Sequence, residues 1–518
     1  MNHIAAPRIA RRTFLKGSVV GGGLLVAGCG NDTDPGAGSN SAGESSAKTL
    51  RVGIPTDVEL PKTQMFVATN QPLRRTVFDY LIDKNPDGTY RPALAREWEW
   101  NDDRTELVLT LRDGVTFHTG REFGPEDVLA SVEAALSEES SAQAAKLLER
   151  AATIEESGPM EVTVTFDSPF PSYLDALAML PIIDSETYPD IADGEQVVGT
   201  GPFQWKSWTP GREIEMVRSD SYWGDQPAIE EVLFRIIPEP EAMLAAMRSG
   251  ELELVNRMTP RDASRLPEDR FVVDNSEGFD VYVGVNTDVQ PLDDIRVRQA
   301  IAYALDRERI AEQVYSGLAE PSCVPWSSSV PGVTEEQTTH YAYDVERART
   351  LLQEAGAEGA EVVLTSFAAD PAYGAVEEIV QFGLEEIGLN VRSEAYDQAE
   401  FVEHLQAADF PGLWVTPIAL TAMGPATALM TALPLTVGEN THNVTDAEYE
   451  SLVEDLTTAA SEEERETATS ALTDYMLEQA FHNTVVQAQT PVVGVTGLSG
   501  VEVDLTLALD LTKATLST

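Results

Sequence analysis

Residues 361–395 read EVVLTSFAADPAYGAVEEIVQFGLEEIGLNVRSEA, and this stretch decides the fold class. Residues 361–366 and 390–395 are rich in β-branched and apolar side chains and have the length of strands. Between them, apolar residues recur at helical spacing over residues 375–387, and Gly388 is a typical residue to end that helix. Strands that are joined by a helix through short loops run parallel. The sequence therefore predicts an α/β fold with a parallel sheet in this half of the chain.

The same patterns predict further elements on both sides of this unit. Period-two alternation and helical spacing indicate strands over residues 50–54, 105–111 and 162–166, and helices over residues 126–136, 294–314 and 346–355. Two sequences of the form Ser/Thr-x-x-Glu, beginning at Thr445 and Ser461, resemble capping boxes. We expect each of them to open one of the last two helices of this half.

The composition restricts the class of protein. The chain has 518 residues, more than one compact core usually holds, so two or three domains are expected. Its 35 basic and 86 acidic residues give a net charge of −51, which would repel the phosphates of a nucleic acid. Two explanations of the acidity stay open, namely a solvated surface that keeps an extracellular protein soluble, and adaptation to high salt.

The N-terminus has the pattern of an export signal for a lipoprotein. Arg11 and Arg12 form a twin-arginine pair, and the apolar run over residues 19–27 is too short to span a bilayer. Small residues precede Cys29, whose thiol is the expected site of a diacylglycerol, and two acyl chains give stable anchoring. We therefore expect a cleaved signal at residues 1–28 and a flexible tether at 29–47. The alternative is a membrane anchor with an incidental cysteine.

Seven short motifs occur in a fixed order along the rest of the chain. They are VFDYL at 77–81, PALAREW at 92–98, LRDGVTFH at 111–118, EDV at 126–128, GTGPF at 199–203, YWG at 222–224 and DIRVRQAI at 294–301, which ALDR follows at 304–307. Through these motifs the chain resembles the family 5 extracellular solute-binding proteins, which serve peptide, nickel and opine-type ABC importers. The resemblance extends from about Leu50 to the C-terminus.

The resemblance implies a two-lobed clamp of the periplasmic-binding-protein type, with two crossing segments and an extra small subdomain on the first lobe. The expected first lobe combines residues 48–75, 197–278 and 486–518, the small subdomain covers 76–196, and the second lobe covers 279–485. A ligand would lie between the lobes, and hinge closure would bury it.

Four residues are candidate ligand contacts. Tyr282 and Asn286 share one face of the alternating stretch 279–286, which the resemblance places at the floor of the cleft. Asp57 follows the first strand, and Trp414 matches an aromatic residue that the family carries in its second lobe. Two alternatives stay open: Tyr282 would equally well only pack the hinge, and Trp414, for which the cleft is favoured, would otherwise be a core residue.

The segment around Trp414 departs from the pattern of peptide-binding members. Those members carry an aspartate in this loop for the ligand's α-amino group, whereas residues 410–438 contain no charged residue and read Gly424-Pro425 at that place. The arginine that some members use for a carboxylate is also missing at residues 373–375, and Ala426 stands where nickel-type members have a histidine. We expect a neutral, apolar or sugar-like ligand, and neither a metal nor a cofactor.

The sequence favours a binding protein over other classes. The predicted role is that of a monomer on the outer face of the cytoplasmic membrane that delivers a small molecule to the permease of an ABC importer. A surface sensor that binds the same solute is the main alternative. An exported hydrolase is disfavoured because no Gly-x-Ser-x-Gly or His-Glu-x-x-His motif occurs, and a structural or adhesive lipoprotein would not explain the ordered motifs.

Overall fold

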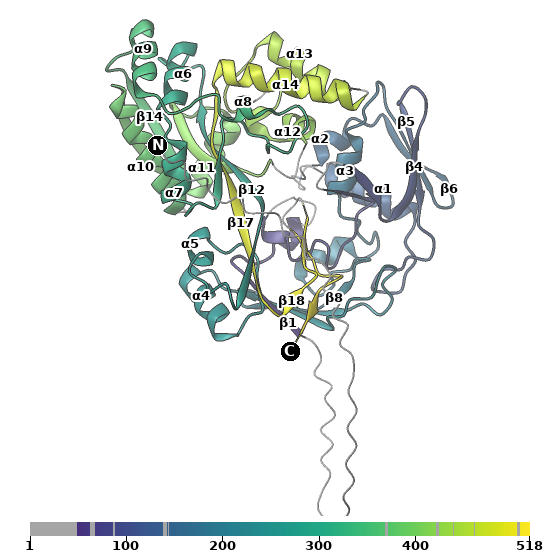
Figure 1. The fold of residues 1–518 in the computed structure, drawn as a ribbon. Helices are drawn as coiled ribbons and strands as arrows, with labels where there is room; N and C mark the ends of the chain where they lie inside the picture. Colours follow the sequence, from purple (N-terminus) through teal and green to yellow (C-terminus); the bar gives the residue numbers. More distant parts are fainter. Residues whose placement is uncertain are drawn as a thin grey trace, which may run out of the picture.

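The computed structural model describes residues 49–62, 68–85, 89–137, 142, 144–367, 371–420, 424–438, 440–459, 461–504 and 508–517. These residues form two α/β lobes and a small subdomain that surround a central opening of the ribbon (Figure 1). One sheet passes through both lobes in the order β15-β14-β16-β12-β17-β11-β1-β10-β9-β8, and β13 (Ala319–Pro321) pairs with β17 outside this order. The end of the sheet with β8 belongs to the first lobe, and the end with β15 belongs to the second lobe.

The first lobe is built on the half of the sheet that contains β1 (Thr49–Ile54). β1 runs parallel to β10 (Glu231–Ile236) and β11 (Leu254–Val255), and β9 (Glu213–Arg218) and β8 (Phe203–Thr209) extend the sheet in antiparallel order. The other elements of this lobe are η1 (Leu60–Lys62), η2 (Ala68–Asn70), η3 (Tyr188–Asp193), α4 (Pro240–Ser249), α5 (Pro260–Ala263), β18 (Leu498–Ser499), β19 (Glu502–Val503), β20 (Leu509–Asp510) and β21 (Thr515–Leu516).

The small subdomain, comprising the elements from β2 to α3, packs three helices on an antiparallel sheet. The sheet order is β4 (Ala95–Trp100), β5 (Glu106–Leu111), β7 (Glu161–Thr165) and β6 (Thr153–Gly158). Its other elements are the hairpin of β2 (Ile82–Lys84) and β3 (Tyr90–Pro92), and the helices α1 (Pro125–Leu136), α2 (Ala145–Leu148) and α3 (Tyr173–Met179). Alternate residues of β5 and β7 enter the core, as period-two patterning requires.

The second lobe contains the predicted parallel unit. β14 (Glu361–Phe367), α10 (Pro371–Glu386) and β15 (Asn390–Tyr396) form it, and β16 (Leu413–Ile418) lies parallel on the other side of β14. The remaining elements are α6 (Ile295–Ala304), α7 (Arg307–Gln313), α8 (Glu335–Thr338), α9 (Val345–Ala355), α11 (Gln398–Ala407), α12 (Pro425–Thr431), η4 (Leu433–Leu435), α13 (Ala447–Thr458) and α14 (Glu462–Gln479). Helices α12 to α14 share an apolar core of their own, which we call the helical layer.

The two lobes are joined by the crossing strands β12 (Phe271–Val285) and β17 (His482–Val495). They pair antiparallel from Phe271 opposite Val495 to Gly284 opposite His482, and the register shifts between residues 276 and 279 and again between residues 281 and 282. β16 pairs with the end of β12 that lies in the second lobe. The two-lobed clamp expected from the resemblance is therefore present, with its crossing segments hydrogen-bonded to each other.

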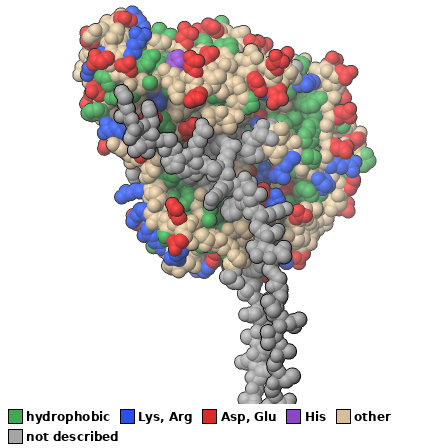
Figure 2. Space-filling view, viewed as in Figure 1, with side chains coloured by type: hydrophobic (Ala, Val, Ile, Leu, Met, Phe, Trp, Pro, Cys, Tyr) green, Lys and Arg blue, Asp and Glu red, His purple; other side chains and the backbone are tan. Residues whose placement is uncertain are grey.

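Most of the predicted elements are confirmed, and two details were wrong. The helical pattern over residues 294–314 forms two helices, α6 and α7, because the Asp306 side chain accepts a hydrogen bond from the Arg309 N–H at 3.1 Å and caps a new helix. Asp446, not Thr445, caps α13. The capping box of Ser461 and Glu464 is confirmed. Acidic side chains are spread over the visible surface, with arginine and lysine between them (Figure 2).

Candidate functional site

The crossing strands join the two lobes, and three of the candidate contacts lie on or beside these strands. Tyr282 and Gly284 of β12 lie opposite Thr416 and Trp414 of β16. The ends of β12 and β16 that pair as Asp280 with Ile418 are nearer to the first lobe. Trp414 therefore lies four residues further into the second lobe than Ile418, which is at the end of β16 nearer to the first lobe.

Tyr282 and Trp414 are brought together by the sheet, and both are fully buried. Trp414 stacks on Phe410 with ring centroids 4.6 Å apart and on His442 at 5.0 Å, and its Nε1–H donates to the Tyr282 hydroxyl at 3.4 Å. Tyr282 stacks in turn on His482 at 4.0 Å. Neither ring presents a face to solvent in this conformation, and a direct contact with a ligand stays a prediction for both.

Asn286 is held by bonds within the second lobe. Its Nδ2–H donates to the Phe410 carbonyl at 2.8 Å, and its Oδ1 accepts from the Asp288 N–H at 3.1 Å and from Asn443 Nδ2 at 2.9 Å. All three bonds connect the end of β12 to neighbouring loops. The amide therefore fixes the crossing strand, and its proposed contact with a ligand stays a prediction.

Asp57 lies in the first lobe, away from the other three candidates. Its carboxylate accepts hydrogen bonds from Trp208 Nε1 at 3.0 Å, from the Gly211 N–H at 2.6 Å and from the Val58 N–H at 2.8 Å. These bonds attach the turn between β8 and β9 to the segment that follows β1. The structure thus gives Asp57 a role in holding this turn, and its predicted role in binding is untested.

A buried polar chain crosses the joint of the two crossing strands, and the sequence did not point to it. His482 Nε2 lies 2.7 Å from Asp280 Oδ2, His482 Nδ1 lies 3.2 Å from His442 Nε2, and His442 Nδ1 lies 3.2 Å from the Val285 carbonyl oxygen. Burial raises the pKa of Asp280 well above its usual value and lowers the pKa of His482 to about 3. Burial thus disfavours the charged form of both groups, as is expected for a polar chain that is closed off from solvent.

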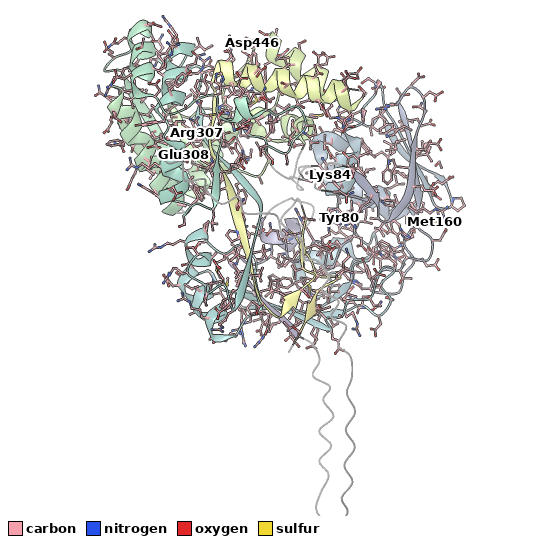
Figure 3. All side chains as sticks on the ribbon, viewed as in Figure 1. Tyr80, Lys84, Met160, Arg307, Glu308 and Asp446 are labelled. Carbon is pink, nitrogen blue, oxygen red and sulfur yellow. The ribbon has the colours of Figure 1, made fainter. Side chains whose placement is uncertain are left out.

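The second lobe touches the small subdomain through α12. Asp175 of α3 accepts hydrogen bonds at Oδ1 from Lys84 Nζ at 2.6 Å and from the Tyr90 hydroxyl at 2.7 Å. Its other oxygen, Oδ2, accepts from the Thr427 hydroxyl of α12. Figure 3 shows Lys84 at the inner edge of the subdomain. The uncharged segment after Trp414 is therefore part of a contact between the lobes.

Other sequence predictions concern metals, membranes and cysteine. Within the described ranges, no group of three or more His, Cys, Asp or Glu side chains is placed to hold a metal ion, and no helix is long and apolar enough to cross a bilayer. Cys323 is a free, buried thiol beside the backbone of Tyr341. Arg11, Arg12 and Cys29, with the predicted signal and tether, lie outside the described residues.

Comparison with known proteins decides the family. Residues 89–432 match the family described as bacterial extracellular solute-binding proteins, family 5 Middle. The chain belongs to this family. The matched range includes the small subdomain, the crossing strand β12 and the parallel unit of the second lobe. The family resemblance expected from the seven motifs is confirmed.

The relatives of this family-5 protein carry different ligands in their names. The dipeptide-binding protein of Escherichia coli is 26% identical over 60% of this chain and 64% of its own length. Heme-binding protein A of Haemophilus influenzae is 27% identical over 63% of this chain and 65% of its own length. The match therefore spans less than two thirds of either relative.

Solved structures show the same fold over nearly the whole chain. The binding protein AgaA of A. tumefaciens R10 with agropinic acid has a TM-score of 0.78 at 22% identity and covers 91% of this chain and 99% of its own. A peptide-binding protein AppA of Clostridium difficile has a TM-score of 0.81 at 20% identity, with coverage of 90% and 100%. At these identities the likeness concerns the fold alone.

Proposed function

We propose that this family-5 protein captures a small molecule between its two lobes and delivers it to the permease of an ABC importer. The observation that carries the proposal is the match of residues 89–432 to the solute-binding family on a clamp whose lobes are joined by two paired strands. Such a joint allows hinge closure, and a ligand favours the closed state through contacts made there. A monomer suffices for this role, and no catalytic step is required.

The proposed site lies between the lobes. We propose boundaries of 48–75, 197–278 and 486–518 for the first lobe, 76–196 for the small subdomain and 279–485 for the second lobe. Tyr282 and Asn286 support the crossing strand at this joint. Asp57 would contact the ligand from the first lobe and Trp414 from the second lobe. In the present conformation each of these four side chains is engaged by its own lobe, so ligand contacts by them require these contacts within each lobe to rearrange.

Ligand-dependent stabilisation tests the proposal. The chain from residue 31 onward is expected to unfold at a temperature that rises with ligand concentration. The screen includes dipeptides, other peptides, heme and agropinic acid, the ligands named for the relatives and solved structures above, together with sugars and apolar solutes. If none of these ligands stabilises the chain, or if a ligand that binds is hydrolysed, solute delivery is contradicted. A surface sensor would bind the same solute, so binding does not separate the two roles. Uptake of the solute by cells that lack the protein separates them: we expect uptake to be lost if the protein feeds an importer and to persist if it is a sensor.

The proposed location is the outer face of the cytoplasmic membrane, with an anchor at Cys29. The twin-arginine pair, the short apolar run and the small residues before Cys29 support it. Mass spectrometry of the mature N-terminus is the test. We expect a chain that begins at Cys29 and carries a thioether-linked diacylglycerol. A mature N-terminus elsewhere, or an unmodified cysteine, contradicts the anchor.

A further inference from the structure

The helix α12 is shared between the second lobe and the small subdomain. Ala428 and Leu429 belong to the apolar core of the helical layer, whereas Met430 packs against the core of the subdomain. α12 also packs on α2. In Figure 1 this contact lies across the central opening from β12 and β17. Among the residues that the structure describes, the contacts on this side are non-covalent, so opening of the clamp would separate α12 from the subdomain.

A buried carboxylate, that of Asp175, lies in this contact. Asp175 of the subdomain and Thr427 of α12 are both buried, and Thr427 has no exposed surface. Lys84 and Tyr90, the other two donors to Asp175, belong to the hairpin of the same subdomain. When the lobes separate, these two donors move with Asp175, and the Thr427 hydroxyl moves away. One of the three hydrogen bonds therefore depends on closure.

The electrostatics of Asp175 favour a bond of the stronger, charge-assisted kind. Burial alone would raise the pKa of Asp175, but the nearby Lys84 ammonium and the three donors hold the pKa below its usual value. The carboxylate is therefore ionised, and a hydrogen bond to an ionised group contributes more to stability than one between neutral groups. Loss of such a bond shifts a two-state equilibrium by about tenfold.

We propose that the hydrogen bond from Thr427 to Asp175 is a latch that stabilises the closed clamp whether or not a ligand is bound. The proposal rests on the proposed function in that it assumes a clamp that opens and closes. The latch shifts the equilibrium of the empty protein toward closure, and it slows release, because a ligand leaves only after the clamp opens. It acts equally on every ligand, since neither side chain needs to touch the solute.

The test compares Thr427→Val with Thr473→Val in the full chain carrying Cys29→Ala. Thr473 is a matched control, because it is also a buried helical threonine of the second lobe, but its hydroxyl donates to the Thr469 carbonyl within α14 at 2.7 Å. Dyes on Glu155→Cys of β6 and Glu450→Cys of α13, both exposed, report the distance between subdomain and second lobe by single-molecule fluorescence transfer. We expect Thr427→Val to lower the ratio of closed to open molecules by about tenfold without ligand, and Thr473→Val to leave it unchanged.

A second measurement keeps the result independent of folding defects. Amide hydrogen exchange over residues 425–431 is expected to accelerate in Thr427→Val, while exchange in the parallel unit of residues 361–396 stays as in the unmodified chain. Asp175→Asn is expected to shift the ratio in the same direction, and the double variant to add little to it. An unchanged ratio in Thr427→Val overturns the latch. These readouts need no ligand, so a failed ligand screen would refute the proposed function and leave the latch standing.

Discussion

Arg307 offers the sharpest test of how the family motif ALDR at 304–307 builds the second lobe. Its side chain is buried, and it donates only to backbone carbonyls among the hydrogen bonds that the structure records. Nε donates to Ser322 at 3.1 Å and Thr484 at 2.9 Å, and Nη1 donates to Ala302 at 3.0 Å, Tyr341 at 3.1 Å and Leu305 at 3.5 Å. Figure 3 places Arg307 near the second-lobe end of β17. One guanidinium thus joins α6, two loops and a crossing strand.

Replacement of Arg307 by methionine would leave these carbonyls without their donor. Four of the bonds are 3.1 Å or shorter, and an unsatisfied buried acceptor costs about 1 kcal/mol even at the lower end of the measured range, so the loss amounts to about 4 kcal/mol. Burial also lowers the pKa of the guanidinium, and removing this buried charge offsets part of the loss. We expect Arg307→Met to reduce the free energy of unfolding by about 3 kcal/mol.

Urea unfolding monitored by tryptophan fluorescence measures this change. The midpoint is expected to fall without a change in the dependence on urea. Arg309→Met is the matched control, because Arg309 lies on the same helix but bonds at the surface to Gln313 at 3.2 Å, and its loss costs less than about 1 kcal/mol. If Arg307→Met were as stable as Arg309→Met, the carbonyl bonds would not be what holds these segments together.

Two further predictions concern pH and packing. His118 Nε2–H donates to the Gly201 carbonyl at 2.9 Å, and burial lowers its pKa to about 4, so the folded state binds fewer protons than the unfolded state below pH 6.5. The free energy of unfolding of the unmodified chain should therefore fall by about 3 kcal/mol relative to His118→Gln between pH 6.5 and 4, and parallel pH profiles would contradict this. A Cβ on Gly284 would lie 2.1 Å from Trp414 Cε2, so Gly284→Ala should destabilise the second lobe by about 3 kcal/mol. Gly374→Ala, where a Cβ meets nothing within 4 Å, should cost nothing, and urea unfolding of the two variants measures the difference.

Local patterns were sufficient to predict the parallel unit. Its strands and helix are each specified by residues that lie next to one another in the sequence, and the structure pairs Glu361 with Asn390 in parallel as expected. The start of α10 at Pro371, rather than residue 375, follows from proline's preference for the first helical turn. The break between α6 and α7 depends on one capping side chain, Asp306, which a continuous helical period conceals.

The contacts of the candidate site depend on residues far apart in the sequence, and this is why they were missed. The bond between Asp280 and His482 spans 202 positions, and the one between Asp175 and Thr427 spans 252. No spacing rule links such residues. The signal available was a polar residue between apolar neighbours, as at Asp280, which Phe279 and Val281 flank.

The uncharged stretch of residues 410–438 has a structural cause that bears on the ligand. Ala426, Thr427, Ala428 and Leu429 are all buried, since α12 packs on the helical layer on one side and on the small subdomain on the other. A charged side chain in this helix would have to be buried in the contact at high cost. Packing thus explains the missing charges at the buried positions of α12 without reference to the solute, so for these positions the absence of charge is no evidence of a neutral ligand.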